Sequence, residues 1–110
     1  MTDRPRMRFG DLVPYETPRT LDALHGPAHG TVAAPPNINT SPNPLYDIDQ
    51  PGQRKALYTA TVRDGYPRQQ ESILNRDILL QLWATLTLPP RCRDIWNARF
   101  PALAAIRSTE

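Results

Sequence analysis

Residues 75–90, which read NRDILLQLWATLTLPP, decide the fold class of this chain. Apolar side chains in this stretch recur at the spacing i, i+1, i+4, i+5 and i+8, which is typical of one face of an α-helix: Ile78, Leu79, Leu82, Trp83 and Leu86. Asn75 is a favourable N-cap in front of this face, and Asp77 lies where an acidic side chain stabilises the first helical turn. The pattern predicts a helix over 76–87 that ends before the proline pair at 89–90.

Helical signals continue upstream of this stretch. Asp49 is a favourable N-cap with a proline close behind it, and Gly65 is a residue type that commonly follows the last helical turn. The sequence therefore predicts a helix from Pro51 to Asp64, followed by a short helix over 68–73.

A further helix is predicted downstream, because proline is well tolerated in a first turn and the pair at 89–90 therefore also marks a helix start. Helically spaced apolar residues follow, and Pro101 closes the helix: Cys92, Ile95, Trp96 and Phe100. We expect Trp83 and Trp96 to pack together.

Proline dominates the first part of the chain. Eight of the 13 prolines precede Asp47, and each removes a backbone donor and fixes φ. Residues 1–46 are predicted to be a Pro-rich extended arm, with a helical turn capped by Thr20 and a short edge strand over 30–34. Residues 47–107 are predicted to be a small helical module. The expected fold class is mainly α: a cluster of three to four short helices preceded by a long, largely irregular arm that needs a partner surface to become ordered.

Charge and cysteine content narrow the class of protein. The net charge of +2 is small, and basic and acidic residues are mixed along the chain. A nucleic-acid surface, in contrast, usually carries a clustered basic stripe. One cysteine permits no intrachain disulfide and no thiolate metal cluster. The N-terminus lacks an apolar signal region and no apolar run approaches a membrane span, so we expect a soluble, cytoplasmic protein with no membrane association.

Catalytic and metal-binding patterns are missing or have a simpler explanation. The sequence holds no Gly-rich phosphate loop and no nucleophile elbow. His25 and His29 have the spacing of two ligands on one helix, but the Gly-Pro pair between them forbids that helix. Asp47 and Asp49 lack further carboxylates nearby, and Cys92 lies on an apolar face as a small hydrophobic side chain. We expect no enzymatic activity, no cofactor and no metal.

Protein binding is the remaining class of function. Aromatic and arginine side chains dominate binding hot spots, and several are concentrated in the helical module. The candidate partner-binding residues are Tyr46, Trp83, Arg91, Arg93, Trp96, Arg99 and Phe100. A helix-turn-helix built from 76–87 and 90–100 is an alternative, with these arginines facing DNA. The proline pair in its turn and the aromatic residues on its second helix favour a solvated basic face instead.

Several segments of the sequence resemble the pattern of one protein family. These are Leu45-Tyr46-Asp47-Ile48-Asp49, Arg54-Lys55-Ala56-Leu57-Tyr58, Val62-Arg63-Asp64-Gly65, Leu74-Asn75-Arg76-Asp77-Ile78-Leu79, Leu82-Trp83, the run from Leu86 to Trp96, and Arg99-Phe100-Pro101-Ala102-Leu103. Over residues 45–103 the chain resembles small actinobacterial antitoxin or regulator proteins that are encoded beside nucleotidyltransferase toxins of the abortive-infection type, a type IV toxin–antitoxin arrangement. The chain departs from the family pattern at Ala84, Cys92 and Asn97, where the family usually has proline, valine and an acidic residue.

The resemblance implies an antitoxin-like protein that neutralises a nucleotidyltransferase acting on tRNA or a similar acceptor. Neutralisation by direct binding is one mechanism, and a change in the toxin's modification state or expression is the other. The arm and the aromatic residues favour direct binding, with residues 83–101 docking and residues 1–46 wrapping around the toxin. The alternatives are a DNA-binding transcriptional regulator, whose binding would weaken steeply with salt, and an accessory subunit of another protein complex.

Overall fold

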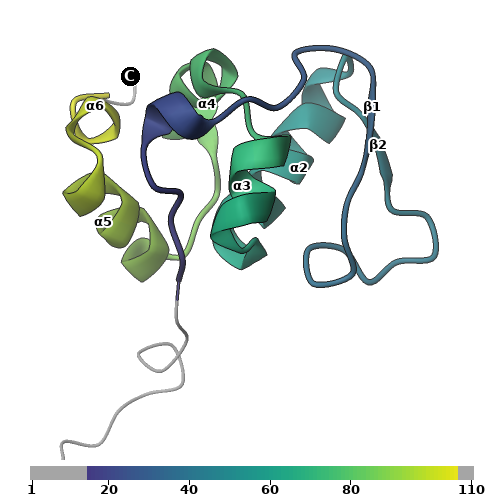
Figure 1. Cartoon of the computed structure of the whole chain (residues 1–110), viewed down its shortest axis with the longest axis horizontal. Coiled ribbons are helices and arrows are strands. Elements are labelled where there is room, and N and C mark those ends of the chain that lie inside the picture. Colours follow the sequence, from purple (N-terminus) through teal and green to yellow (C-terminus); the bar gives the residue numbers. More distant parts are fainter. Residues whose placement is uncertain (1–14, 107–110) are drawn as a thin grey trace, which may run out of the picture.

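The computed structural model describes residues 15–106 and is mainly helical, as the sequence predicts (Figure 1). Within the described range it contains five α-helices, two short 3-10 helices and one pair of strands. In chain order these are η1 (Leu21–Ala23), β1 (Thr31–Ala33), β2 (Leu45–Asp47), α2 (Pro51–Asp64), α3 (Pro67–Ile73), α4 (Arg76–Leu82), η2 (Trp83–Thr85), α5 (Pro90–Arg99) and α6 (Pro101–Ala104). The part of the predicted arm before Tyr15 lies outside the described residues.

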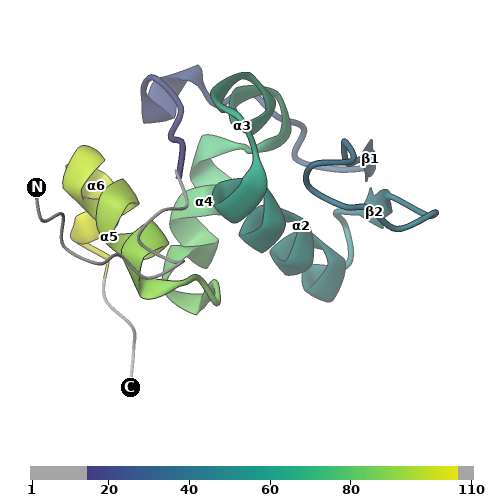
Figure 2. The ribbon, with the colours of Figure 1, turned by 90° about the horizontal axis from the view of Figure 1, so that it is seen from below.

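From β1 onward the elements follow one another along the long axis of the molecule, whereas η1 lies beside α4 (Figure 1). Figure 1 shows the strand pair at one end, α5 and α6 at the other, and α2, α3 and α4 between them. Figure 2 shows the same order from below. Residues 15–20, which we call the strap, run between α3 and α5 on their way to η1 (Figure 1).

Several predicted helix ends are confirmed. Helix α2 spans Pro51–Asp64, as its proline and glycine signals indicate. The Asn75 side chain caps α4 by accepting hydrogen bonds from the backbone N–H groups of Asp77 and Ile78, at 3.1 and 3.2 Å. Thr20 likewise caps η1 through the N–H of Ala23 at 3.1 Å. These ends depend on local chemistry, which is why the sequence reveals them.

The prediction that Asp49 caps α2 is wrong. Gln50 is the N-cap residue, and no side chain bonds the cap. The Asp49 carboxylate instead lies 2.9 Å from Nδ1 of His29 and accepts the N–H of Gly30 at 3.2 Å. These bonds lower the pKa of Asp49, the contact with His29 most strongly. Asp49 therefore ties the start of β1 to the chain ahead of α2.

Gly65 ends α2, but in an extended conformation with φ −77° rather than a left-handed one. A β-carbon at this position would lie 2.6 Å from the carbonyl oxygen of Thr61, so close approach is the reason for glycine. The other departure is α4, which ends at Leu82 and tightens into η2 instead of continuing to residue 87. The Leu86 N–H closes that turn on the Trp83 carbonyl at 3.3 Å.

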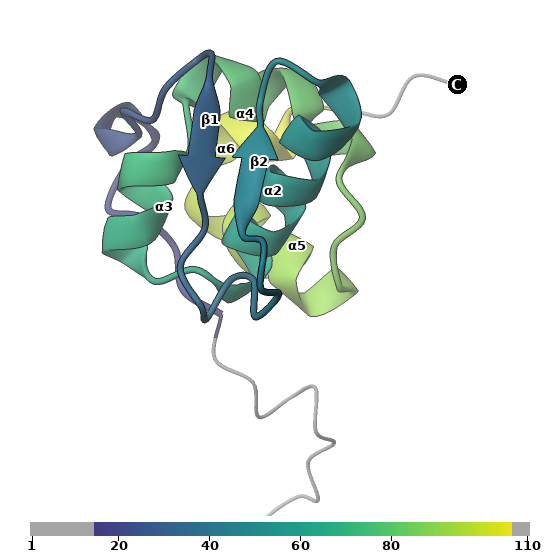
Figure 3. The ribbon, with the colours of Figure 1, turned by 90° about the vertical axis from the view of Figure 1, so that its right-hand side faces the viewer.

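The strand pair is antiparallel, with Thr31 opposite Asp47, Val32 opposite Tyr46 and Ala33 opposite Leu45. Strand β1 confirms the edge strand predicted over 30–34. Strand β2 was not predicted. Figure 3 shows the two strands side by side in front of the helices.

One hydrophobic core joins the two predicted parts of the chain. It contains the helical residues Leu57, Leu79 and Leu103, and also Leu24 and Ile38 from before residue 46. Pro18 in the strap is fully buried as well. Composition divides the chain at residue 46, but packing does not, because the helices alone leave apolar faces that the upstream loops cover.

Candidate functional site

The large aromatic side chains chosen as partner-binding candidates lie mostly in the core. Trp83 and Trp96 pack together as expected, with ring centroids 5.9 Å apart, and Phe100 lies 5.7 Å from Trp96. All three rings are buried, at 1%, 0% and 6% exposure. They are covered because α4, η2, α5 and α6 pack around them, so their surfaces are used within the fold.

Arg93 is also used inside the fold. Its guanidinium donates a 3.0 Å hydrogen bond to the Trp83 carbonyl and a second one to the Leu86 carbonyl, and it lies 4.9 Å from the Trp83 ring centroid. These carbonyls lie at the two ends of η2: the Trp83 carbonyl also accepts the Leu86 N–H that closes the turn, and the Leu86 carbonyl follows the last residue of η2, where helical bonding stops. Arg93 therefore acts as a C-terminal cap for the segment that ends α4.

The other predicted candidates lie nearer the surface. Arg91 is exposed and lies 5.9 Å from the ring centroid of Tyr15 in the strap. Arg99 is exposed and donates to the backbone carbonyl of Arg19 at 3.2 Å. Tyr46 is half-buried, and its hydroxyl accepts a hydrogen bond from Asn39 at 2.9 Å. The structure therefore does not gather the seven predicted residues into one exposed patch.

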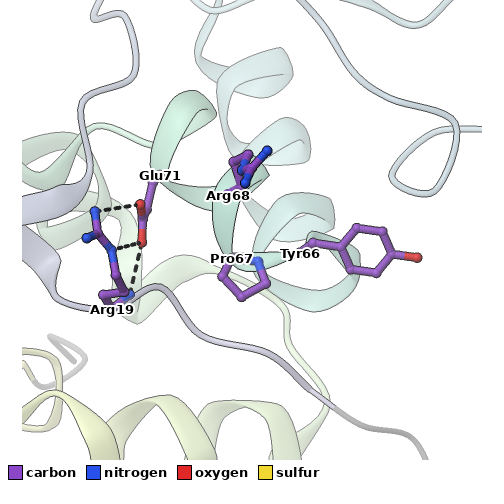
Figure 4. Close-up of a pocket in the computed structure, with 5 residues that line it drawn as sticks. All are labelled: Arg19, Tyr66, Pro67, Arg68 and Glu71. Carbon is purple, nitrogen blue, oxygen red and sulfur yellow. Dashed lines mark hydrogen bonds and ion pairs between the residues drawn. The ribbon is translucent and has the colours of Figure 1, made fainter.

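A cleft of about 550 Å³ opens between the strap and α3 (Figure 4). Five residues line it: Arg19, Tyr66, Pro67, Arg68 and Glu71. Figure 4 shows Arg19 and Glu71 facing each other on one side, while Tyr66 points away from them on the other. None of these residues was a candidate from sequence.

The ion pair on one side of the cleft is held by three hydrogen bonds. Nε and Nη2 of Arg19 each approach a Glu71 carboxylate oxygen at 3.2 Å, and the Arg19 backbone N–H donates to the same carboxylate at 3.0 Å. The Glu71 side chain is only 11% exposed, whereas that of Arg19 is 78% exposed. The side-chain bond lowers the pKa of Glu71 and raises the pKa of Arg19. The exposed Arg19 guanidinium therefore still has N–H groups that Glu71 does not use.

The strap is fixed to both neighbouring helices. The Gln70 side chain donates to the Glu16 carbonyl at 2.9 Å from the side of α3, and Arg99 contacts the strap from α5. The contact between Arg19 and Glu71 spans 52 positions, so no local pattern predicts it. The sequence gives only the residue type as a hint of this contact, because Glu71 is a charged residue on a short predicted helix. Its neighbours Gln70 and Ile73 are buried in the structure.

Tyr66 forms the opposite side of the cleft and is 56% exposed. Its backbone is fixed, because its N–H donates to Gln69 Oε1 at 2.9 Å and Gln69 in turn exchanges hydrogen bonds with Asn37 at 2.8 and 2.9 Å. The adjacent Arg68 is exposed. A tyrosine with a fixed backbone, a proline and two guanidinium groups around one cleft fit a partner surface that offers apolar contact and hydrogen-bond acceptors together.

Cysteine and histidine chemistry lies elsewhere. Cys92 is buried, as predicted, and burial raises the pKa of its thiol to about 11. His25 and His29 are both exposed in the loop between η1 and β1. Within residues 15–106, no group of three or more His, Cys, Asp or Glu side chains could hold a metal ion.

Comparisons with known proteins add no family to these observations: no family model, no curated protein and no solved structure matches the chain. No helix in the described range is both long and apolar enough to cross a membrane.

Proposed function

We propose that this chain is a non-enzymatic, antitoxin-like protein that binds and neutralises a nucleotidyltransferase toxin in the cytoplasm. The resemblance over residues 45–103 supports the class of partner. The cleft between the strap and α3 supports direct binding as the mechanism. The proposed docking surface is therefore this cleft rather than the segment from Trp83 to Pro101.

The exposed ring of Tyr66 is the observation that carries the proposal. The fold buries both tryptophans, Phe100 and Tyr58, yet it leaves Tyr66 more than half exposed. Tyrosine is enriched at binding hot spots because it brings a large contact area with little conformational freedom to lose. Its backbone is already fixed by Gln69, so little ordering would be needed on binding.

The charges around the ring define the partner surface. Arg68 and the N–H groups of Arg19 that Glu71 does not use supply donors, and Glu71 is already neutralised by Arg19. A matching surface would present a carboxylate or backbone carbonyls toward the arginines and an apolar patch toward Tyr66 and Pro67. Such a contact would sequester part of the toxin without any chemical step on this chain.

The DNA-binding alternative is less favoured, because Arg93 makes hydrogen bonds within the fold. Its second helix would need Arg93 to face a groove, but Arg93 bonds the Trp83 and Leu86 carbonyls instead. Arg99 bonds the strap. Binding to an operator would fall steeply between 50 and 200 mM salt, by about 10³ or more for a protein with several phosphate contacts, whereas a contact that combines Tyr66 with only two arginines would fall much less.

The direct test uses the nucleotidyltransferase encoded by the neighbouring reading frame. We expect the two purified proteins to elute together on a sizing column and the full chain to suppress nucleotide transfer to tRNA. Tyr66→Ala and Arg68→Ala should each weaken binding about tenfold or more, the loss typical of a hot-spot residue.

Leu45→Ala is the matched control, because Leu45 is 55% exposed but lies on β2, away from the cleft. It should leave binding unchanged. Absence of co-elution at any ratio would overturn the proposed function. Co-elution that Tyr66→Ala and Arg68→Ala do not weaken would overturn the assignment of the cleft as the docking surface.

A further inference from the structure

Strand β1 has an outer edge at which the backbone N–H and C=O groups of two residues point away from β2. The bonds that flank the strand pair run from the Ala34 N–H to the Pro44 carbonyl at 3.0 Å and from the Ile48 N–H to the Gly30 carbonyl at 2.9 Å. Bonding residues alternate in an antiparallel pair, so Val32 exchanges its bonds with Tyr46. It follows that Thr31 and Ala33 direct their N–H and C=O groups outward.

The outer edge of β2 is different, because side chains close it. The Leu45 N–H donates to Asn43 Oδ1 at 3.4 Å, and the Asp47 N–H donates to Gln53 Oε1 at 2.8 Å. No such bond reaches Thr31 or Ala33 from any residue in the described range, and both residues are exposed. The sheet therefore has one closed edge and one open edge, and an open edge is a template for another strand.

We infer that a second copy of this chain pairs with β1, antiparallel and about a two-fold axis through Val32. In this register Thr31 of each copy lies opposite Ala33 of the other copy, which gives two such pairs. Each of these pairs exchanges two main-chain hydrogen bonds, so all the outward groups of both strands are satisfied by the same groups of the other copy.

The side chains suit this register. On the inner face the row across the new sheet would read Tyr46, Val32, Val32 of the second copy and Tyr46 of the second copy. Two β-branched valines would meet at the non-hydrogen-bonded position, where cross-strand side chains are closest. Both Val32 and Tyr46 are half-buried against the core, so a second copy would cover surface that is still exposed.

The outer face avoids charge repulsion in the same register. Each row there would read Leu45, Ala33, Thr31 of the second copy and Asp47 of the second copy, so no row contains two carboxylates. The register that satisfies the backbone thus also separates the acidic residues.

The length of the edge limits the strength of the dimer. Gly30, with φ +97°, bounds β1 on one side, and Pro35 bounds it on the other. A contact of about four main-chain hydrogen bonds is small beside a standard interface, so the dimer should be weak and concentration-dependent. It should also stop at two copies, because pairing uses the open edge of each sheet and the other edge is closed.

Sedimentation velocity on the full chain, from about 10 μM to about 1 mM, tests the inference at the concentrations where a weak interface forms. We expect a shift from monomer to dimer across this range and no larger species. Ala33→Lys should raise the dissociation constant at least about tenfold, because a lysine on an edge strand opposes pairing. Leu45→Lys adds the same charge to the same face of the sheet but away from the open edge, and should leave the dissociation constant unchanged.

A cysteine at the proposed axis gives an independent measurement. Opposed residues at a non-hydrogen-bonded position have Cα atoms about 4.5 Å apart, within the range that a disulfide bridges. Val32→Cys should therefore cross-link two copies under mild oxidation, whereas Leu45→Cys should not. The native Cys92 is buried and does not compete.

Monomer at every concentration together with no Val32→Cys cross-link would overturn the inference. A monomeric chain whose binding to another protein is abolished by Ala33→Lys would overturn it too, in favour of a strand supplied by that protein. The sedimentation and cross-linking measurements use the chain alone, so their outcome is separate from that of the proposed toxin binding.

Discussion

Gly26 lies against the end of α3 so closely that a β-carbon on it would be 2.1 Å from the carbonyl oxygen of Ile73. The contact is held by backbone bonds: the His25 N–H donates to the Glu71 carbonyl and the Gly26 N–H to the Leu74 carbonyl, both at 2.8 Å. Through these bonds the loop after η1 closes the last turn of α3, where helical carbonyls lack donors of their own.

Gly26→Ala should therefore destabilise the fold. The new methyl group meets backbone atoms, which cannot rotate away, and we expect a loss of about 2–4 kcal/mol in the free energy of unfolding. Urea denaturation followed by circular dichroism measures it. Gly52→Ala is the control, because a β-carbon there meets open space and should cost nothing. Equal stability of the Gly26→Ala protein would contradict the close contact.

The pair of Arg19 and Glu71 predicts a dependence of stability on pH. The folded-state pKa of Glu71 is lowered from its usual value of 4.5, chiefly by the side-chain bond to Arg19. A depressed carboxyl pKa contributes stability that is complete above the unfolded pKa and is lost as the pH falls through the folded one. The thermal midpoint should therefore fall more steeply below about pH 4.5 in the native protein than in Glu71→Gln.

Above that pH, Glu71→Gln should melt at a lower temperature than the native protein, and the difference should shrink as the solution is acidified. Glu16→Gln is the comparison, because Glu16 offers its backbone carbonyl rather than its carboxylate to Gln70. Parallel pH profiles for the native protein and Glu71→Gln would exclude a stabilising role for the pair.

Asn97 holds the indole of Trp83 through its side chain. The Trp83 Nε1–H donates to Asn97 Oδ1 at 3.0 Å, and the ring is buried. Asn97→Ala should cost about 1–2 kcal/mol, because it leaves the indole donor unsatisfied. Asn97→Asp keeps an acceptor at this position and should cost less. Chemical denaturation of both variants compares them; equal losses would show that the acceptor is unimportant.

Cys92 should react slowly with thiol reagents while the chain is folded. The side chain is fully buried, and its raised pKa of about 11 leaves almost no thiolate near neutral pH. An aromatic disulfide reagent added at pH 8 should react at least about a hundredfold faster in denaturant than in buffer, because its target is the exposed thiolate. Rapid reaction in buffer would mean that the surroundings of Cys92 open readily.

The parts of the fold that the sequence predicts are those determined by neighbouring residues. The bounds of α2 and the Asn75 cap follow from spacing or cap chemistry over a few positions, and the contact of Trp83 with Trp96 follows from two neighbouring helices that each carry a tryptophan on the apolar face. Asp49 shows the limit of that approach: it is a suitable cap by type, but a long-range contact with His29 and Gly30 takes its carboxylate.

The cleft was not predictable by the same means. Arg19 and Glu71 meet because the strap returns across α3, and the sequence places them far apart. The exposure of Tyr66 also depends on how α2 turns into α3, and the periodicity of a seven-residue helix is too short to show which side is outward. Sequence reasoning chose the buried aromatic residues as contacts because residue type alone does not distinguish core from surface.

The shared core has a consequence for the order in which the protein matures. Leu24 and Ile38 emerge from the ribosome well before Trp96 and Leu103, which complete the same core. Until Leu103 has emerged, a growing chain holds its apolar loops without all the helices that cover them. Newly made chains should therefore pass through a period in which chaperones and proteases have access to these loops.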